Sequence, residues 1–197
     1  MVKSKVIDYN PARKEIKAAK KCVANMEASQ NLDDMEQLWR DCLNHIEKSF
    51  TKLLSATTPV KQKFSNIFST QYQLRKTDKL LVYIKQARDS DNHSIQDISE
   101  KKGPAIGINP KHDGDMLHIE KLTFDSQGNI LLSSHNAVVE FLPERINVIA
   151  VKNRGVEYNP PTSHVGKPFL TRNPVELAKS AIIFYEDWIE ASSKHFS

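Results

Sequence analysis

Apolar residues recur at three- and four-residue steps through most of the first hundred positions, the spacing that gives an α-helix one buried face. Long stripes over residues 11–28 and 32–54, and a shorter one behind Pro59, predict three helices. Asn31 is placed to cap the second of them, and a fourth helix begins at Asp78 after a short break. The buried face of the third helix is predicted from Phe64, Ile67, Phe68 and Tyr72.

The pattern changes after residue 102, where Gly and Pro residues punctuate the chain instead of building helices. Residues 126–129, Ser-Gln-Gly-Asn, have the composition of a hairpin turn. The flanking segments alternate between apolar and polar residues, which predicts a small antiparallel sheet with one face covered by the helices. The strand-like runs are residues 105–108, 117–124, 130–134 and 138–151.

A last helix is predicted from Pro174, which suits a first helical position. The chain then divides into a helical bundle over residues 1–100, a β-rich insertion and connector over 101–172, and a C-terminal helix over 173–197 that completes the bundle. The fold class predicted is mainly α, a helical bundle with a small antiparallel β-sheet insertion before the last helix.

Composition narrows the class of protein. The 197 residues are 39% hydrophobic and 26% charged, which is ordinary for a soluble domain. No apolar run is long enough to span a membrane and no secretory h-region is visible, so we expect a cytoplasmic protein. Cys22 and Cys42 lie within helical patterns and are expected as free thiols.

Cofactor and metal chemistry find little support in the sequence. No phosphate-binding glycine loop, nucleophile elbow or paired-cysteine motif is present. His112 and His118 lie near Asp113 and Asp115, but the Asp-Gly turn between them and their spacing are typical of a loop rather than of a zinc site. We therefore expect neither a metal nor a cofactor.

Positive charge gathers in front of the fourth helix. The net charge is +4, and residues 61–88 hold seven basic residues against one acidic residue, Asp78. A basic segment of this kind suits a phosphate-bearing ligand, although lysines also simply solvate helix faces. Lys79 and Lys85 are the candidate phosphate contacts within the helix itself.

The fourth helix carries the most reactive group of side chains. Its sequence from residue 78, DKLLVYIKQARDSDNHSI, follows an apolar face with six consecutive polar residues. Arg88 keeps its charge and fits phosphate, whereas His93 titrates near neutrality and can move a proton. Together they suffice in kind for metal-independent RNA cleavage, in which one group assists attack by a ribose hydroxyl and the other stabilises the charge on phosphorus.

The spacing of these two residues restricts how they act. Five residues of regular helix place Arg88 and His93 about 140° apart, whereas Asp89 shares a face with His93 and Asn92 shares one with Arg88. Both can act on one phosphate only if the helix distorts after Ala87 or if two copies of the chain face each other. The polar residues that follow Ala87 are mediocre helix formers, which makes fraying there reasonable.

The segment LLVYIKQARDSDNH resembles the motif helix of the HEPN superfamily, in which an Arg is followed by a short polar stretch and a His. The resemblance implies a dimeric helical bundle whose two motifs meet in one composite site. It implies Arg88 and His93 as the catalytic pair, with Asp89 as a polar helper, and a cyclic phosphate as product. Many members are endoribonucleases, often toxins that have an antitoxin partner or antiviral proteins.

Two classes of function that use the motif remain open from the sequence, and a third is a structural or assembly protein whose sheet and last helix make the interface. One is a HEPN-like endoribonuclease acting as a homodimer on RNA. The other is a non-catalytic module that binds nucleotide, RNA or a protein partner through the same bundle. In either case Asn92 is a candidate substrate contact, and so is His164 if the last helix packs beside the motif helix.

Overall fold

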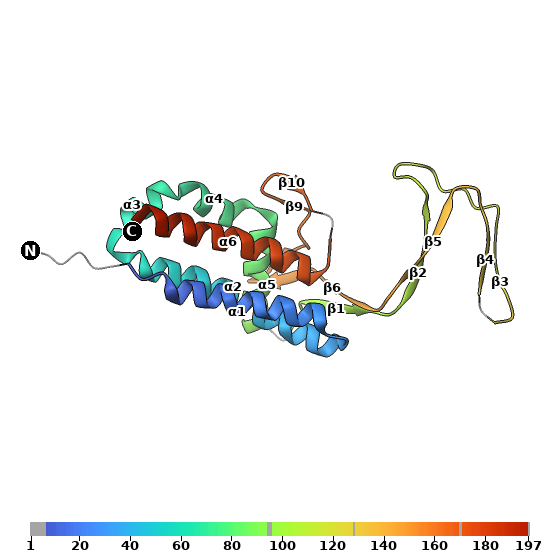
Figure 1. Cartoon of the computed structure of the whole chain (residues 1–197), viewed down its shortest axis with the longest axis horizontal. Helices are drawn as coiled ribbons and strands as arrows, with labels where there is room; N and C mark the ends of the chain where they lie inside the picture. Colours follow the sequence, from blue (N-terminus) through green and yellow to red (C-terminus); the bar gives the residue numbers. More distant parts are fainter. Residues whose placement is uncertain (1–6, 94–95, 128, 170, 197) are drawn as a thin grey trace, which may run out of the picture. The chain divides into compact units, whose positions relative to one another are not determined.

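The computed structural model describes residues 7–93, 96–127, 129–169 and 171–196. The chain forms two compact units, a helical unit with residues up to 101 and from 146 onward, and a strand-rich unit with residues 102–145. All described helices lie in the helical unit (Figure 1). They are α1 (Asn10–Ala28), α2 (Leu32–Ala56), the 3-10 turn η1 (Thr58–Val60), α3 (Lys61–Ile67), α4 (Ser69–Thr77), α5 (Lys79–His93) and α6 (Pro174–Phe196).

The core of the helical unit lies between α1, α2, α5 and α6. Helices α1 and α2 pack along their lengths, and α6 packs against both. Their apolar stripes are buried, and Trp39 of α2 and Trp188 of α6 are almost completely excluded from water. The prediction of a mainly α protein is therefore confirmed.

Polar caps begin three of these helices. The side chain of Asn31 accepts a hydrogen bond from the Asp33 amide at 2.8 Å, as its position predicts. Asn173 accepts one from the Val175 amide at 2.9 Å and so caps α6. Asp78 does the same for α5, and this cap also belongs to the candidate site described below.

The third predicted helix is divided into three pieces. The chain forms η1 and α3, and a new helix, α4, begins at Ser69. Phe64 and Phe68 are buried and pack against Trp188, as predicted. Ile67 is 44% exposed, so its assignment to the buried face is wrong, because the helix ends at this residue.

The connector before α6 belongs with the helices, which places the boundary of the strand-rich unit at residue 145 instead of 172. Ile146, Val148 and Val151 are buried, and β7 packs against α5. The strands of this region form short antiparallel hairpins, β7 with β8 and β9 with β10, while β6 pairs with β1. Their bounds are β1 (Ser99–Lys102), β6 (Arg145–Val148), β7 (Val151–Asn153), β8 (Val156–Tyr158), β9 (Ser163–His164) and β10 (Lys167–Pro168).

Both hairpins turn through two consecutive residues with positive φ, as two-residue type I′ turns do. Arg154 and Gly155 have φ values of 50° and 82°. Val165 and Gly166 have values of 48° and 75°. A β-branched residue is strained in this region, so the conformation of Val165 must be held by its surroundings.

The strand-rich unit consists of two antiparallel pairs instead of the single sheet that the alternation predicts. Strand β2 (Ala105–Pro110) pairs with β5 (Ala137–Leu142), and β3 (Lys121–Phe124) pairs with β4 (Ile130–Ser133). The predicted turn at residues 126–129 joins β3 to β4, and Gly128 lies outside the described residues.

Two of the predicted strands are shorter or broken. Within the predicted strand over 117–124, residues 117–119 form no strand, and the Asn136 side chain donates to the Met116 carbonyl at 2.8 Å and accepts from the His118 amide at 3.2 Å. The run over residues 138–151 is interrupted on either side of β6. Phe124 and Phe141 are 65% and 69% exposed, so the expected covered face does not include them.

Candidate functional site

Helix α5 holds the motif by an apolar face and a polar cap. Four residues of that face, Leu80, Leu81, Ile84 and Ala87, are fully buried, as the sequence predicts. The helix packs against α2, α4, α6 and the strands β7 and β9. Its direction is therefore fixed from several sides, which makes it a rigid support for reactive side chains.

Of the two arrangements that the spacing left open, the break after Ala87 is absent, because α5 continues without interruption to His93. Polar contacts hold its last two turns on the neighbouring elements. Asp91 forms an ion pair with Arg40 of α2, and Asn92 donates a hydrogen bond to the Asn44 side chain at 3.2 Å. These tertiary bonds offset the weak helix propensity of the segment.

Arg88 and Asp89 form a pair on the surface of α5. The Arg88 Nη1 donates to Asp89 Oδ1 at 2.9 Å, and the two side chains are 32% and 23% exposed. The Nε of Arg88 is buried and has no hydrogen-bond partner in the part of the chain that the structure describes. Because this Nε is buried, an anion would have to be bound by the Nη groups of the side chain, one of which already donates to Asp89.

His93 is the last residue of α5, and it is exposed. Its ring makes no hydrogen bond to a described residue, and residues 94 and 95 of the motif stretch lie outside the described part. Because the helix is regular, His93 and Arg88 project about 140° apart. Within one copy, the structure thus presents the pair on different faces of α5.

His164 lies at the opposite end of α5 from the motif. Its Nδ1 is 3.0 Å from Asp78 Oδ1, and the Val165 amide donates to Asp78 Oδ2 at 2.6 Å. Asp78 and Arg88 are ten residues apart, which is about 15 Å along a helix axis. His164 therefore positions the start of α5 and is not brought to the side chain of Arg88.

Asp78 is a buried carboxylate that holds three donors. It accepts from the Leu81 amide as the cap of α5, and from His164 and Val165 of the β9–β10 hairpin. Burial on its own raises the pKa of Asp78, but these hydrogen bonds and the nearby imidazole outweigh it and lower the pKa below its ordinary value of 3.8. The ionised form of Asp78 therefore stabilises both elements.

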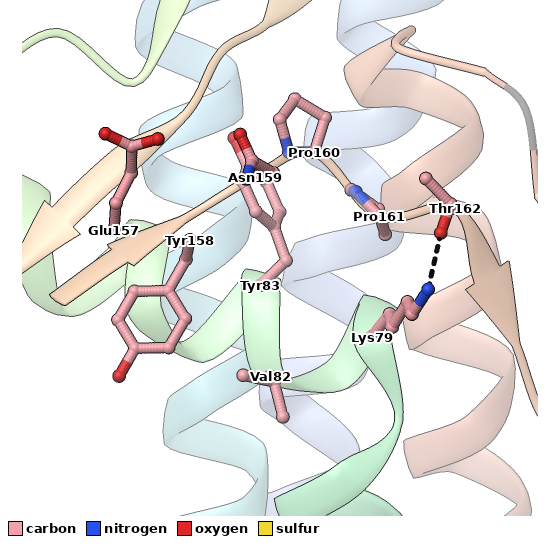
Figure 2. A pocket seen from close by; sticks show the side chains of 9 residues that line it. All are labelled: Lys79, Val82, Tyr83, Glu157, Tyr158, Asn159, Pro160, Pro161 and Thr162. Atoms are coloured by element: carbon pink, nitrogen blue, oxygen red, sulfur yellow. Dashed lines mark hydrogen bonds between the residues drawn. The ribbon is translucent and has the colours of Figure 1, made fainter.

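Lys79 and Lys85 line two adjoining pockets along α5. The Lys79 pocket, about 430 Å³, is walled by α5 and by the segment from Glu157 to Thr162 (Figure 2). The Lys79 Nζ donates to Thr162 Oγ1 at 2.9 Å. The Lys85 pocket, about 530 Å³, lies between α5, α4 and α2. Both pockets have Val82 and Tyr158 in their walls, and we call the two together the α5 groove.

A buried ion pair forms the floor of the Lys85 pocket. Arg75 bonds both oxygens of Glu47, at 2.9 and 2.6 Å, and also donates to the Tyr185 hydroxyl. Its guanidinium lies 3.9 Å from the ring centre of Phe50. Burial tends to lower the pKa of Arg75, but Glu47 outweighs it and raises the pKa above its ordinary value. This cation is therefore already neutralised within the fold.

Sequence reasoning missed Tyr158, because a single tyrosine after a short strand carries no local signal. The structure brings it against α5, seventy-odd residues away along the chain, in the wall shared by the two pockets. Among the described residues, no group of three His, Cys, Asp or Glu side chains is arranged to hold a metal ion. In the same residues, no helix is both long and apolar enough to cross a membrane.

No protein-family model matches the chain, and the comparisons with curated proteins and with solved structures also return no match. The function must therefore be argued from the side chains of α5 and the groove beside them.

Proposed function

We propose that this chain is a HEPN-like, metal-independent endoribonuclease that acts as a homodimer. Support comes from one observation above all. Helix α5 is regular to its last residue and carries Arg88, whose side chain is 32% exposed, and His93, which is exposed. These are the two residue types that in-line cleavage of RNA requires when no metal ion assists.

The chemistry would proceed in one displacement. The imidazole of His93 takes the proton of a ribose 2′-hydroxyl, whose oxygen attacks the adjacent phosphorus. The bond from phosphorus to the 5′-oxygen breaks, and that oxygen takes a proton from solvent and leaves as a hydroxyl, while His93 afterwards releases to solvent the proton that it accepted. The products are a 2′,3′-cyclic phosphate and a 5′-hydroxyl end, and an arginine stabilises the added charge on the phosphoryl oxygens.

The angle between the two side chains makes the site composite in this proposal. Because α5 is regular, Arg88 and His93 of one copy diverge by about 140°. A phosphate held by His93 therefore meets Arg88 of the partner subunit across a two-fold axis. Such an interface contains two equivalent sites, each with one residue from each copy.

Cleavage of a labelled RNA in the presence of EDTA tests the proposal. The parent protein should cut, and Arg88→Ala and His93→Ala should each reduce the rate by at least about a hundredfold, the usual scale for one acid–base or charge-stabilising group. His112→Ala is the matched control, because His112 is an exposed histidine of the strand-rich unit. Equal cutting by all variants would refute the assignment.

Mixing the two inactive variants tests whether the site is composite. In a heterodimer of Arg88→Ala with His93→Ala, one site has lost both residues and the other is intact. Random exchange of subunits should therefore restore about one quarter of the parent activity. If Arg88 and His93 act within one copy, the mixture stays inactive.

A second candidate is a binding module without turnover. The observation that favours it is the ion pair between Arg88 and Asp89, which occupies one guanidinium nitrogen in the isolated chain. Such a module binds RNA in a salt-sensitive manner and never releases a cyclic phosphate end. Analysis of the RNA ends after prolonged incubation separates the two candidates.

A further inference from the structure

The α5 groove combines the two properties that single-stranded nucleic acid requires, cationic side chains and aromatic surfaces. It is made by elements that lie far apart in the sequence, since α4 and α5 form one side and the chain from Glu157 to Thr162 the other. Both pockets are open to solvent at the surface of the helical unit. The groove is therefore available to an extended ligand.

The usable positive charge of the groove comes from three lysines. Lys76, Lys79 and Lys85 line it, against one acidic lining residue, Glu157. Arg75 also lines the groove, but its charge is compensated by Glu47. Lysine is a point charge that can follow a phosphate without a fixed geometry, which suits contact with a backbone rather than with one base.

Aromatic and proline side chains supply flat apolar walls between these cations. Tyr158 and Val82 belong to both pockets and so form the wall between them. Pro160 lines the Lys79 pocket (Figure 2), and Tyr72 lines the Lys85 pocket. Tyr83 is also in the lining, but it is 1% exposed and its hydroxyl donates to the Ile149 carbonyl, so it offers no stacking surface. Tyr158 is half-buried, which leaves part of its side chain accessible to a ligand.

The groove follows α5 as far as Gln86, on the N-terminal side of the motif residues. Beyond it β7 packs on α5, and the Asn153 side chain donates a hydrogen bond to Gln86 at 2.7 Å. Lys85, which also lines the groove, lies three residues before Arg88 and shares a helix face with it. The groove therefore lies on the motif helix itself, beside its first half.

We propose that the α5 groove binds two consecutive nucleotides of single-stranded RNA, with one base on each side of Tyr158. The backbone phosphates lie against Lys76, Lys79 and Lys85. The inference rests on the proposed function for its choice of RNA, and it adds the place where the substrate strand is held. Stacking and phosphate contacts are tolerant of sequence, so little base preference follows from the groove.

Binding of a probe that cannot be cut tests the groove separately from catalysis. The probe is a fluorescein-labelled octauridylate with 2′-O-methyl riboses, in which the attacking hydroxyl is blocked, and fluorescence anisotropy reports its binding. Tyr158→Ala should weaken binding by at least about fivefold, the lower end of the effect of a stacked base. Tyr158→Phe keeps the ring and should bind as the parent does.

Charge-reversal variants of the groove lysines are the second test of binding. Lys76→Glu combined with Lys85→Glu should weaken binding at least tenfold. It should also reduce the steepness of the plot of log affinity against log salt concentration by about 1.4, because each phosphate contact of a single strand contributes about 0.7 to that slope and two contacts are removed. Lys14→Glu combined with Lys21→Glu is the matched control, since both lysines are exposed on α1 outside the groove. It should keep at least half of the parent affinity.

The outcomes distinguish failure of the groove from failure of the nuclease. If the parent does not bind the probe, or if the groove and control variants lose affinity equally, the groove proposal is overturned even where RNA is cut. If groove-dependent binding is present but unmodified RNA is never cut, the groove stands and the proposed nuclease fails. Circular dichroism of each variant confirms that the helices are retained before the affinities are compared.

Discussion

Removing the carboxylate of Asp78 should destabilise the helical unit, because this side chain ties the start of α5 to the β9–β10 hairpin. The residue is 7% exposed and accepts hydrogen bonds from Leu81, His164 and Val165. Asp78→Ala removes a helix cap, which costs about 0.5–2 kcal/mol. It also leaves the Val165 amide without its acceptor, which costs about 1–3 kcal/mol if that donor stays buried. We expect a total loss of about 3 kcal/mol.

Urea denaturation followed by tryptophan fluorescence measures this loss. Trp39 and Trp188 are both buried in the core of the helical unit, so their emission reports its unfolding. Asp187→Ala is the matched control, since Asp187 is an exposed acidic residue of α6, and it should change stability by less than about 0.5 kcal/mol. Asp78→Asn keeps one acceptor oxygen and should lose about 1 kcal/mol.

The pH dependence gives the sign of the electrostatic contribution. The pKa of Asp78 is lowered in the folded protein, so its ionised form adds stability at pH values above the ordinary value of 3.8. That stability is lost as the pH falls through the folded pKa, because the carboxylate is protonated there. The gap between the parent and Asp78→Asn should therefore be full at pH 6 and narrow below about pH 4. The reasoning is refuted if Asp78→Ala unfolds at the parent's urea concentration, or if the gap widens in acid.

Two further predictions concern stability. Arg75→Ala or Glu47→Ala alone should lower the free energy of unfolding by about 3–5 kcal/mol, since each leaves a buried charge unpaired. The double variant should lose clearly less than the sum of the two single losses. Urea denaturation measures all three, and additive losses would contradict a coupled pair. Val165→Asn should raise the free energy of unfolding by about 1 kcal/mol, because asparagine tolerates the positive φ that strains valine and Asn-Gly suits this turn. Thr51→Asn, on α2, is a control that should show no such gain. A fall in stability for Val165→Asn would show that the turn is not strained.

The sequence by itself determined four of the helices. Apolar spacing located α1, α2, α5 and α6 because a helix buries one face whatever lies opposite it. The Asn31 cap followed from local chemistry, since its acceptor and donor are two residues apart. Arg88 and His93 were likewise visible as a reactive pair on one helix, and the angle between them followed from helix geometry alone.

The strands depended on partners that the local pattern does not contain. Residues 117–122 alternate as a strand does, yet the strand begins only at Lys121, since the Asn136 side chain accepts a hydrogen bond from the His118 amide. The break after Ala87, one of the two arrangements that the spacing left open, is also absent, because Arg40 and Asn44 of α2 hold the end of α5. Propensity gave the wrong answer in both places, since contacts from a distant part of the chain outweigh it.

The groove and the buried cap of α5 were decided only by tertiary structure. Asp78 and His164 are 86 residues apart in the chain, and Val82 meets Tyr158 across a similar separation. No spacing rule links such residues, because their approach depends on how α5 packs against the connector before α6. The sequence thus showed Arg88 and His93 on one helix, and only the packing of the helical unit formed the groove along that helix.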